Sequence, residues 1–445
     1  MIVFELYILF FLTLLIGYNE VVRKVCHNFA TSIFTILFGI FFVIVPIILH
    51  TFFDGATRLD KTNDSIYFIN DHYHLLNFYS FLILSVILIF SYLNKPKTYV
   101  SPTLDLKIFS DNKVSRRLIY LMPIIGLFIF LFFTDMTISD LLIMGRFSWY
   151  DNPSSNLFMI AISHYFFALT PIAVFLISVS KKNRRFDYFL FSVMLICLIF
   201  YSVISLDRKF IFYILSGVVG SYYFKNNFSL KISLKLFIGM SVIAVFLFFS
   251  QFLRDYLLRF MTSSLALDAS FKEEIWTWAE RLFVAGDISY FYRASCEAIY
   301  ITIQEGIISP GAMILRNLLF FIPSSLTFDL KPEDVAKTFS DLVNGGSAFR
   351  RGNMPPGFFG IIVASFGLYF SMIVMIFVPY ALHKIDRVIR NPLRASGMIM
   401  MSCFISLIVL ALRGDDSSAI YFFIFIFLVV HIAWFISKIK FSISP

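Results

Sequence analysis

The sequence contains few charged residues, and this scarcity excludes the common classes of water-soluble protein. Only 15% of its 445 residues are charged, whereas 59% are hydrophobic and 58 are phenylalanine. Globular domains typically carry about 25% charged and about 45–50% apolar residues. No aqueous core hides so much apolar surface, so we expect an all-α polytopic integral membrane protein whose helices satisfy their own backbone groups.

Cysteine is also rare, and the usual nucleotide and metal motifs are missing. The four cysteines (Cys26, Cys197, Cys296 and Cys403) lie far apart, without a CxxC pair or a neighbouring pair of histidines. This spacing excludes the common zinc and thioredoxin-like sites. No P-loop, GxGxxG, HExxH or GxSxG motif occurs in a suitable context, which argues against ATP-driven transport. We therefore expect no cofactor and no bound metal.

Long apolar runs predict about eleven membrane-spanning helices, because a spanning helix needs about 20 mostly apolar residues. The first run lacks a basic region and a small-residue cleavage site, so we interpret it as a retained helix and not a signal peptide. The expected spans are residues 2–19, 29–52, 75–93, 118–134, 157–179, 187–206, 210–224, 236–253, 357–382, 395–412 and 418–437.

The basic residues alternate between successive connections, which predicts the orientation. Of the 37 Lys and Arg residues, 21 lie in alternate connections and in the tail 438–445, whereas the short connections between them hold only 6. Because Lys and Arg favour the cytoplasmic side, the N-terminus is expected outside and the C-terminus in the cytoplasm. The formal charge of +9 is therefore first a topology signal, and nucleic acid is not an expected partner.

Residues 254–356 form one external loop of 103 residues, which is too long for a simple connector. Ser270 and Glu273 have the spacing of a helix-capping box, and the turn from Gly306 through Ser309-Pro310-Gly311 predicts the end of a helix. The apolar stretch 312–323 is too short to span and is typical of an interfacial or re-entrant helix. The expected organisation is spans one to eight in 1–253, the loop in 254–356, and spans nine to eleven in 357–445.

Several arginines lie at membrane depth or in apolar sequence, where charge is costly and usually functional. Arg208, Arg254 and Arg316 are the clearest cases. The planar guanidinium group can donate two parallel hydrogen bonds to phosphate oxygens, so these residues could hold a lipid-linked pyrophosphate. The ordinary explanation, that each arginine anchors a helix end or pairs with a carboxylate, is at least as good for any one position. Among the external carboxylates we favour Asp287, which follows Arg281 by six residues.

The layout resembles the bacterial O-antigen polymerases, the Wzy-type family of oligosaccharide repeat-unit polymerases. The shared features are the plan of 11 to 12 spans, the turn 207–209 (DRK) after span six, and one large external loop late in the chain. The segments 351–360 (RGNMPPGFFG) and 365–367 (SFG) also look like the Pro/Gly-rich start of the next span in that family. The resemblance covers most of the chain by architecture and about twenty residues by motif.

This resemblance implies a membrane glycosyltransferase of the GT-C type in the bacterial plasma membrane. It would transfer a growing glycan from undecaprenyl pyrophosphate to the non-reducing-end sugar of a new lipid-linked unit, at the outer face and without a metal. Its expected partners are both lipid-linked oligosaccharides, the bilayer and a chain-length regulator protein. The expected catalytic residues are Arg208, Arg254, Arg281 and Asp287, and the expected substrate-binding residues are Lys209, Arg316, Arg350, Arg351, Asn353 and Arg413.

Three other functions remain open, and for one of them, a structural scaffold of a polysaccharide-export complex, the sequence offers no test. An O-antigen ligase would use a histidine late in the large loop, and this loop contains none. A flippase or exporter of lipid-linked oligosaccharide would place its charges around a midplane cavity. Glu5 is the one clear charged residue inside a predicted span, and it lies near the external end. The general base of a polymerase is left unassigned by this comparison, with Asp287 as the first candidate.

Overall fold

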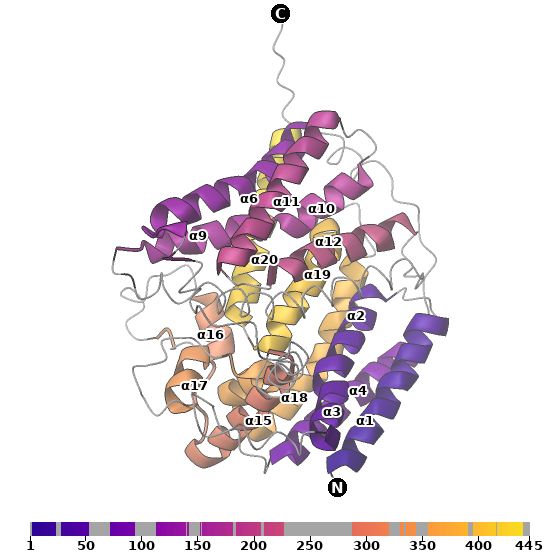
Figure 1. Ribbon diagram of the computed structural model, residues 1–445. Coiled ribbons are helices and arrows are strands. Elements are labelled where there is room, and N and C mark those ends of the chain that lie inside the picture. The colour runs from indigo at the N-terminus through magenta and orange to yellow at the C-terminus, as the bar shows by residue number, and fades with distance from the viewer. Residues whose placement is uncertain are drawn as a thin grey trace, which may run out of the picture. The chain divides into compact units, whose positions relative to one another are not determined.

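The computed structural model is helical throughout the part of the chain that it describes, with no strand there (Figure 1). The chain divides into two compact units, and each is considered by itself. Unit 1 comprises Met1–Pro96, Ala266–Lys384 and Ile408–Ile420, and unit 2 comprises Lys97–Leu265, Ile385–Leu407 and Tyr421–Pro445. The structure describes residues 2–23, 28–52, 72–93, 113–138, 140–141, 152, 154–180, 184–205, 209–226, 287–319, 330–332, 335–343, 355–389, 395–414 and 416–438.

The helices follow the apolar runs of the sequence. Unit 1 contains α1 (Ile2–Gly17), η1 (Tyr18–Arg23), α2 (Phe29–Gly39), η2 (Ile40–Ile44), α3 (Val45–Phe52), α4 (Tyr73–Leu93), α15 (Asp287–Glu305), α16 (Ala312–Leu318) and α17 (Val335–Val343). Unit 2 contains α6 (Lys113–Phe133), α9 (Leu157–Phe167), α10 (Thr170–Val179), α11 (Arg185–Ser205) and α12 (Lys209–Lys225). Residues of α18 (Gly357–Ile389), α19 (Ala395–Arg413) and α20 (Asp416–Lys438) occur in both units.

Eight helical stretches among the described residues are long and apolar enough to cross a membrane, so the protein is a polytopic helical membrane protein. They correspond to eight of the eleven predicted spans. Of the other three, 210–224 corresponds to α12, which has 17 residues, and 418–437 corresponds to α20, whose apolar part is Ala419–Ala433. The span 236–253 and the predicted capping box at Ser270 lie outside the described residues.

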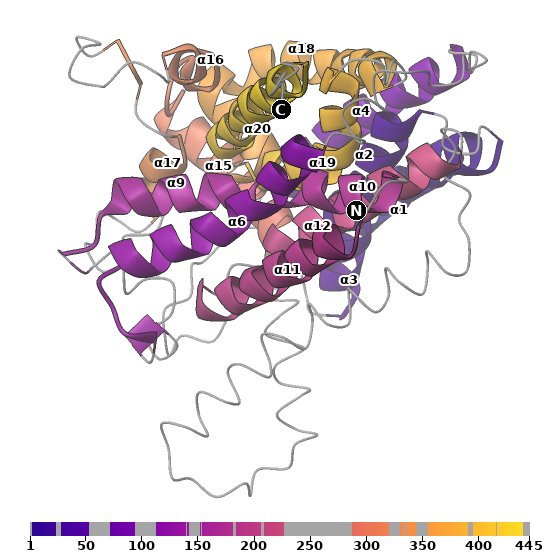
Figure 2. The same cartoon turned by 90° about the horizontal axis from the view of Figure 1, so that it is seen from above.

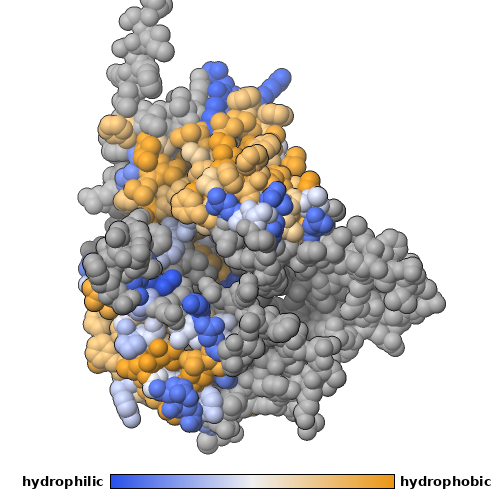
Figure 3. Space-filling model, turned by 90° about the vertical axis from the view of Figure 1, so that its left-hand side faces the viewer, coloured by the Kyte–Doolittle hydropathy of each residue, from blue (hydrophilic) through white to orange (hydrophobic). Residues whose placement is uncertain are grey.

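Unit 2 exposes large apolar side chains that a water-soluble protein would bury. Phe132 of α6 and Phe158 of α9 are 79% and 73% exposed, and Ile196 of α11 is exposed as well. Helix α6 packs against both α9 and α11, and Figure 2 shows the three helices running alongside one another. Figure 3 shows apolar atoms over much of the described surface in its upper part, where these helices lie. Such a surface is suited to lipid.

The predicted span 157–179 is two helices instead of one. Asn156 caps α9, because its side chain accepts a hydrogen bond from the backbone N–H of Met159. Helix α9 ends at Phe167, and α10 begins at Thr170 with Pro171 in its first turn. Proline lacks the N–H that an uninterrupted helix would use, and it is well tolerated only in a first turn.

Helix α18 is broken at Gly367, which has φ 71° and ψ 175°. The break frees backbone carbonyl groups, and the turn between α15 and α16 satisfies two of them. The N–H of Ser309 donates to the carbonyl of Ala364 (3.0 Å), and the N–H of Gly311 donates to that of Ser365 (2.9 Å). The predicted helix end at 306–311 is confirmed, since α15 ends at Glu305 and α16 begins at Ala312.

The start of α18 lies directly against α15, and glycine permits this approach. Gly357 has φ 74°, and a Cβ atom there would lie 2.6 Å from the carbonyl oxygen of Phe291 and would also overlap the Ser295 hydroxyl. A Cβ atom at Gly414, in the turn after α19, would lie 2.6 Å from backbone atoms of Gly357. Three segments of unit 1 therefore meet at Gly357.

Replacing Gly357 with alanine should lower the free energy of unfolding by about 2–4 kcal/mol, because the side chain requires both a left-handed backbone and an overlap. Thermal unfolding of the purified protein in detergent measures the change. Gly17→Ala is the matched control, because a Cβ atom there meets nothing within 4 Å. Equal thermal stability of the two variants would contradict the close packing at Gly357.

Candidate functional site

Helix α15 is the part of the predicted large loop that the structure brings into the core of unit 1. Its side chains from Phe291 to Ile299 are all buried, and it packs against η2, α3 and α4. On another side, Phe339 of α17 packs against Ala294 and Ala298 of α15. A helix that is covered on several sides has a fixed position, and this rigidity suits a functional site.

Polar and aromatic side chains gather where α15 meets the ends of α1, α3 and α4. The closest contact joins Glu5 of α1 to His74 of α4, with 2.7 Å between Oε1 and Nδ1. The other carboxylate oxygen of Glu5 accepts a hydrogen bond from the Asn77 amide at 3.0 Å. We call the following residues the α15 cluster: Glu5, His50, Tyr73, His74, Asn77 and Tyr292.

The Glu5–His74 pair has the geometry of a general base held by a carboxylate. The carboxylate contacts Nδ1, so the ring is oriented, while Nε2 makes no hydrogen bond within the described part of the chain. The two side chains are 29% and 42% exposed, which leaves the imidazole accessible. A histidine oriented in this way can accept a proton from a hydroxyl group.

Stacked aromatic rings join this pair to α15. The rings of Tyr73 and Tyr292 are parallel within 8° at a centroid distance of 5.2 Å, and His50 meets the edge of Tyr73 at 4.8 Å. The Tyr292 hydroxyl donates a long hydrogen bond, 3.4 Å, to the Asn77 side-chain oxygen. Aromatic contacts of this kind stabilise beyond the area that they bury, and here they fix α15 against α3 and α4.

Two charged residues of α15 are buried one helical turn apart. Arg293 and Glu297 are 4% and 7% exposed. Burial lowers the pKa of the Arg293 guanidinium from its usual value, and the nearby negative charge of Glu297 acts in the opposite direction. Charges buried like this are costly unless they are compensated, so they restrict which neighbours α15 can accept.

The structure describes four of the ten predicted site residues, at least in part. The guanidinium of Arg316 donates to the carbonyl of Pro332 at 3.1 Å, which agrees with the ordinary explanation of a loop anchor. Arg413 ends α19, directly before the turn at Gly414 that packs against Gly357. Asp287 is the first residue of α15 and Lys209 the first of α12.

Of these four, Asp287, Arg316 and Arg413 belong to unit 1, and Lys209 belongs to unit 2. The junction at Gly357 brings together the segments that carry Asp287 and Arg413, because Gly357 touches both α15 and the turn after Arg413. Arg208, Arg254, Arg281, Arg350, Arg351 and Asn353 lie outside the described residues, so their roles remain predictions.

Sequence reasoning missed the Glu5–His74 pair, although both residues carry a weak signal. Glu5 is a charged residue in an apolar helix, and His74 lies at the start of another apolar helix. Their 69-residue separation gives no pattern that joins them. Spans one and three run in the same direction in the predicted topology, so both residues are expected at the external end, which is the signal that was available. Among the described residues, no group of three or more His, Cys, Asp or Glu side chains is suited to a metal ion.

Comparison with known proteins identifies no relative: no protein-family model, curated protein or solved structure matches this chain.

Replacing Tyr292 with phenylalanine should change the free energy of unfolding by less than about 1 kcal/mol, because the stacked ring remains and only a long hydrogen bond is lost. Tyr292→Ala should lower it by about 3–5 kcal/mol, because a cavity is left between α15 and α4. Thermal unfolding in detergent separates the two. Tyr369→Ala removes an aromatic ring that is 84% exposed and serves as the control. An alanine variant at 292 as stable as this control would refute the structural role of the stack.

Proposed function

We propose that the protein polymerises lipid-linked oligosaccharide units at a membrane surface, transferring a growing glycan from a polyprenyl pyrophosphate to the non-reducing-end sugar of a new unit. The proposal rests on the polytopic helical fold, on the resemblance to the O-antigen polymerases, and on the accessible Glu5–His74 pair. The pair carries it, because it offers the general base that the resemblance leaves unassigned.

The pair lies at one end of the apolar stretch shared by α1 and α4. At the other end, the Ser91 hydroxyl donates to the carboxylate of Glu20, and the Asn19 amide contacts Ser91. Asn77 and Ser91 are 14 residues apart in α4, which corresponds to about 21 Å of helix. The hydrocarbon core of a membrane is about 30 Å thick. Polar contacts at both ends of this stretch therefore lie nearer the faces of the membrane than its midplane. A base near a face suits a substrate whose lipid stays in the membrane and whose sugars lie outside.

In the proposed reaction, His74 Nε2 takes the proton from a hydroxyl group of the acceptor sugar. The hydroxyl oxygen attacks the anomeric carbon of the donor, a new C–O bond forms, and the bond from that carbon to the pyrophosphate oxygen breaks. The leaving group is the polyprenyl pyrophosphate, whose developing charge needs cationic partners. Arg208, Arg254 and Arg281 remain the residues that the sequence predicts for such a role, and all three lie outside the described residues.

We prefer His74 to Asp287 as the base because Glu5 fixes the orientation of the imidazole ring through a 2.7 Å contact. The N-terminus outside, the outer face of a bacterial plasma membrane and a chain-length regulator remain parts of the proposal.

Deleting the gene from its host tests the function directly. The surface glycan should lose its ladder on a gel and leave lipid A-core with a single repeat unit. Complementation with the intact gene should restore the ladder. Loss of every repeat unit, including the single one, would instead favour a ligase or a flippase, and the leaflet on which lipid-linked units accumulate would separate those two.

His74→Ala should slow glycan elongation by at least about 100-fold, which is the usual contribution of a general base. Glu5→Gln should cause a smaller loss, because the amide still contacts the ring but lacks the charge. The measurement is elongation of lipid-linked units by purified protein over a range of pH. The acid limb of the rate profile, where a histidine base becomes protonated, should be absent in His74→Ala.

His72→Phe is the control, because His72 stacks on Tyr300 at 5.5 Å and phenylalanine keeps a ring there. It should elongate glycan normally. An unchanged acid limb in His74→Ala would remove His74 from the chemistry, even if the overall rate fell.

A further inference from the structure

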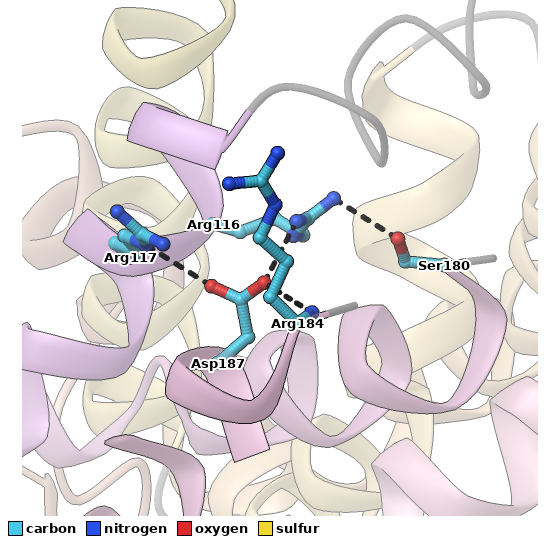
Figure 4. Close-up of polar contacts among 5 residues, drawn as sticks. All are labelled: Arg116, Arg117, Ser180, Arg184 and Asp187. Atoms are coloured by element: carbon cyan, nitrogen blue, oxygen red, sulfur yellow. Dashed lines mark hydrogen bonds and ion pairs between the residues drawn. The ribbon is translucent and has the colours of Figure 1, made fainter. Parts of the chain in front are cut away.

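A compact arginine cluster lies in unit 2, where the beginnings of α6 and α11 meet. We define the arginine cluster as Arg116, Arg117, Arg184, Arg185 and Asp187. Arg116 and Asp187 are fully buried, with 3.1 Å between Nη2 and Oδ2. Arg117 Nε contacts the other carboxylate oxygen, also at 3.1 Å. Figure 4 shows the Asp187 carboxylate between these two arginines.

Both carboxylate oxygens of Asp187 are engaged by groups that hold the helices together. Besides both arginines, its Oδ2 accepts a hydrogen bond from the backbone N–H of Arg184 at 2.9 Å. Arg116 also donates to the Ser180 hydroxyl at 3.0 Å, which ties in the residue after α10. A buried pair with this many partners is rigid, so the residues around it are held in place.

The same arrangement leaves positive charge without a counter-charge. The cluster contains four arginines and one aspartate, and the aspartate is already engaged by Arg116 and Arg117. Arg184 and Arg185 are exposed, and their guanidinium groups form no ion pair within the described part of the chain. In Figure 4 the Arg184 side chain extends past Asp187, and its guanidinium joins none of the marked contacts. Gathering like charges is unfavourable unless an anion joins them.

The surroundings identify the membrane as the source of that anion. The cluster lies at the start of α11, whose apolar stretch Arg185–Ser202 is long enough to span a membrane. Three aromatic side chains beside the cluster in α11 are each at least half exposed, namely Phe186, Tyr188 and Phe189. The Arg117 guanidinium lies 4.7 Å from the centre of the Phe186 ring. Exposed aromatic rings and arginines at the end of an apolar helix are typical of the membrane interface.

We propose that the arginine cluster is a binding site for the phosphate headgroup of an anionic phospholipid. Asp187 fixes the start of α11 through its contacts with Arg116, Arg117 and the backbone N–H of Arg184. The side chains of Arg184 and Arg185 contact the phosphate oxygens. The guanidinium fork matches phosphate geometry, and the neighbouring aromatic rings lie beside the acyl chains. The site is independent of the proposed glycosyl transfer, because none of its residues belongs to the α15 cluster.

Native mass spectrometry of the purified full-length protein, titrated with phosphatidylglycerol or phosphatidylcholine, tests the site. The wild type should retain phosphatidylglycerol in preference to phosphatidylcholine. The double variant Arg184→Gln/Arg185→Gln should bind phosphatidylglycerol roughly 30-fold more weakly, given the usual contribution of each basic residue at a membrane surface. It should fold normally, because both side chains are exposed, and an unchanged thermal unfolding midpoint checks this.

Two further variants distinguish a specific lipid-binding site from a general effect of positive charge on lipid binding. Arg184→Lys/Arg185→Lys keeps the charge and loses the fork, so its affinity should fall between the wild type and the glutamine variant. Lys331→Gln/Lys337→Gln removes two charges from unit 1 and should bind phosphatidylglycerol like the wild type. Equal affinity of the wild type and Arg184→Gln/Arg185→Gln, or an equal loss in the Lys331/Lys337 variant, would overturn the proposal. Displacement of the lipid by millimolar inorganic phosphate would overturn the headgroup assignment.

Discussion

The pairing of backbone polar groups at the break in α18 is the constraint on which much of unit 1 depends. In an apolar environment an unsatisfied carbonyl costs several kcal/mol. The turn between α15 and α16 supplies donors to the carbonyls of Ala364 and Ser365, and the Tyr79 hydroxyl of α4 donates to that of Leu368. The break therefore depends on the α15–α16 turn, and the Tyr79 contact adds a link from α4 to the part of α18 that follows the break.

Charged contacts between helices in the two units, one buried and one partly exposed, act more on specificity than on stability. A buried ion pair is often no more stable than apolar residues of the same size, but breaking it leaves one charge uncompensated. Asp187 finds its two ion-pair partners, Arg116 and Arg117, at the start of α6. Glu5 similarly finds His74 and Asn77 at the start of α4. Apolar helices can slide or rotate against one another at little cost, and these polar contacts select one arrangement for each pair.

The sequence predicts the spans well, because length and apolar composition alone decide them. The span 29–52 agrees with the structure at both ends, and the start of α18 agrees at Gly357. The division of 157–179 into α9 and α10 was not predicted, although Pro171 was a usable signal. The break at Gly367 lies in the segment 365–367 (SFG), which we used only for its resemblance to the polymerase family. The Glu5–His74 pair depends on tertiary packing across 69 residues, and no local pattern contains that information.

The distribution of polar groups along α1 and α4 bears on the choice between an enzyme and a transporter. No Asp, Glu, Lys, Arg or His residue occurs between Glu5 and Glu20 in the first apolar helix, or between His74 and Leu93 in α4. The side chains buried between the two ends include Leu9, Ile83 and Ile87. A transporter needs polar groups near the midplane to carry its cargo across. Between its ends this helix pair offers only hydroxyl side chains such as Thr13 and Ser80 and no charged or imidazole group. This distribution favours the proposed chemistry at a membrane face over transport through this helix pair.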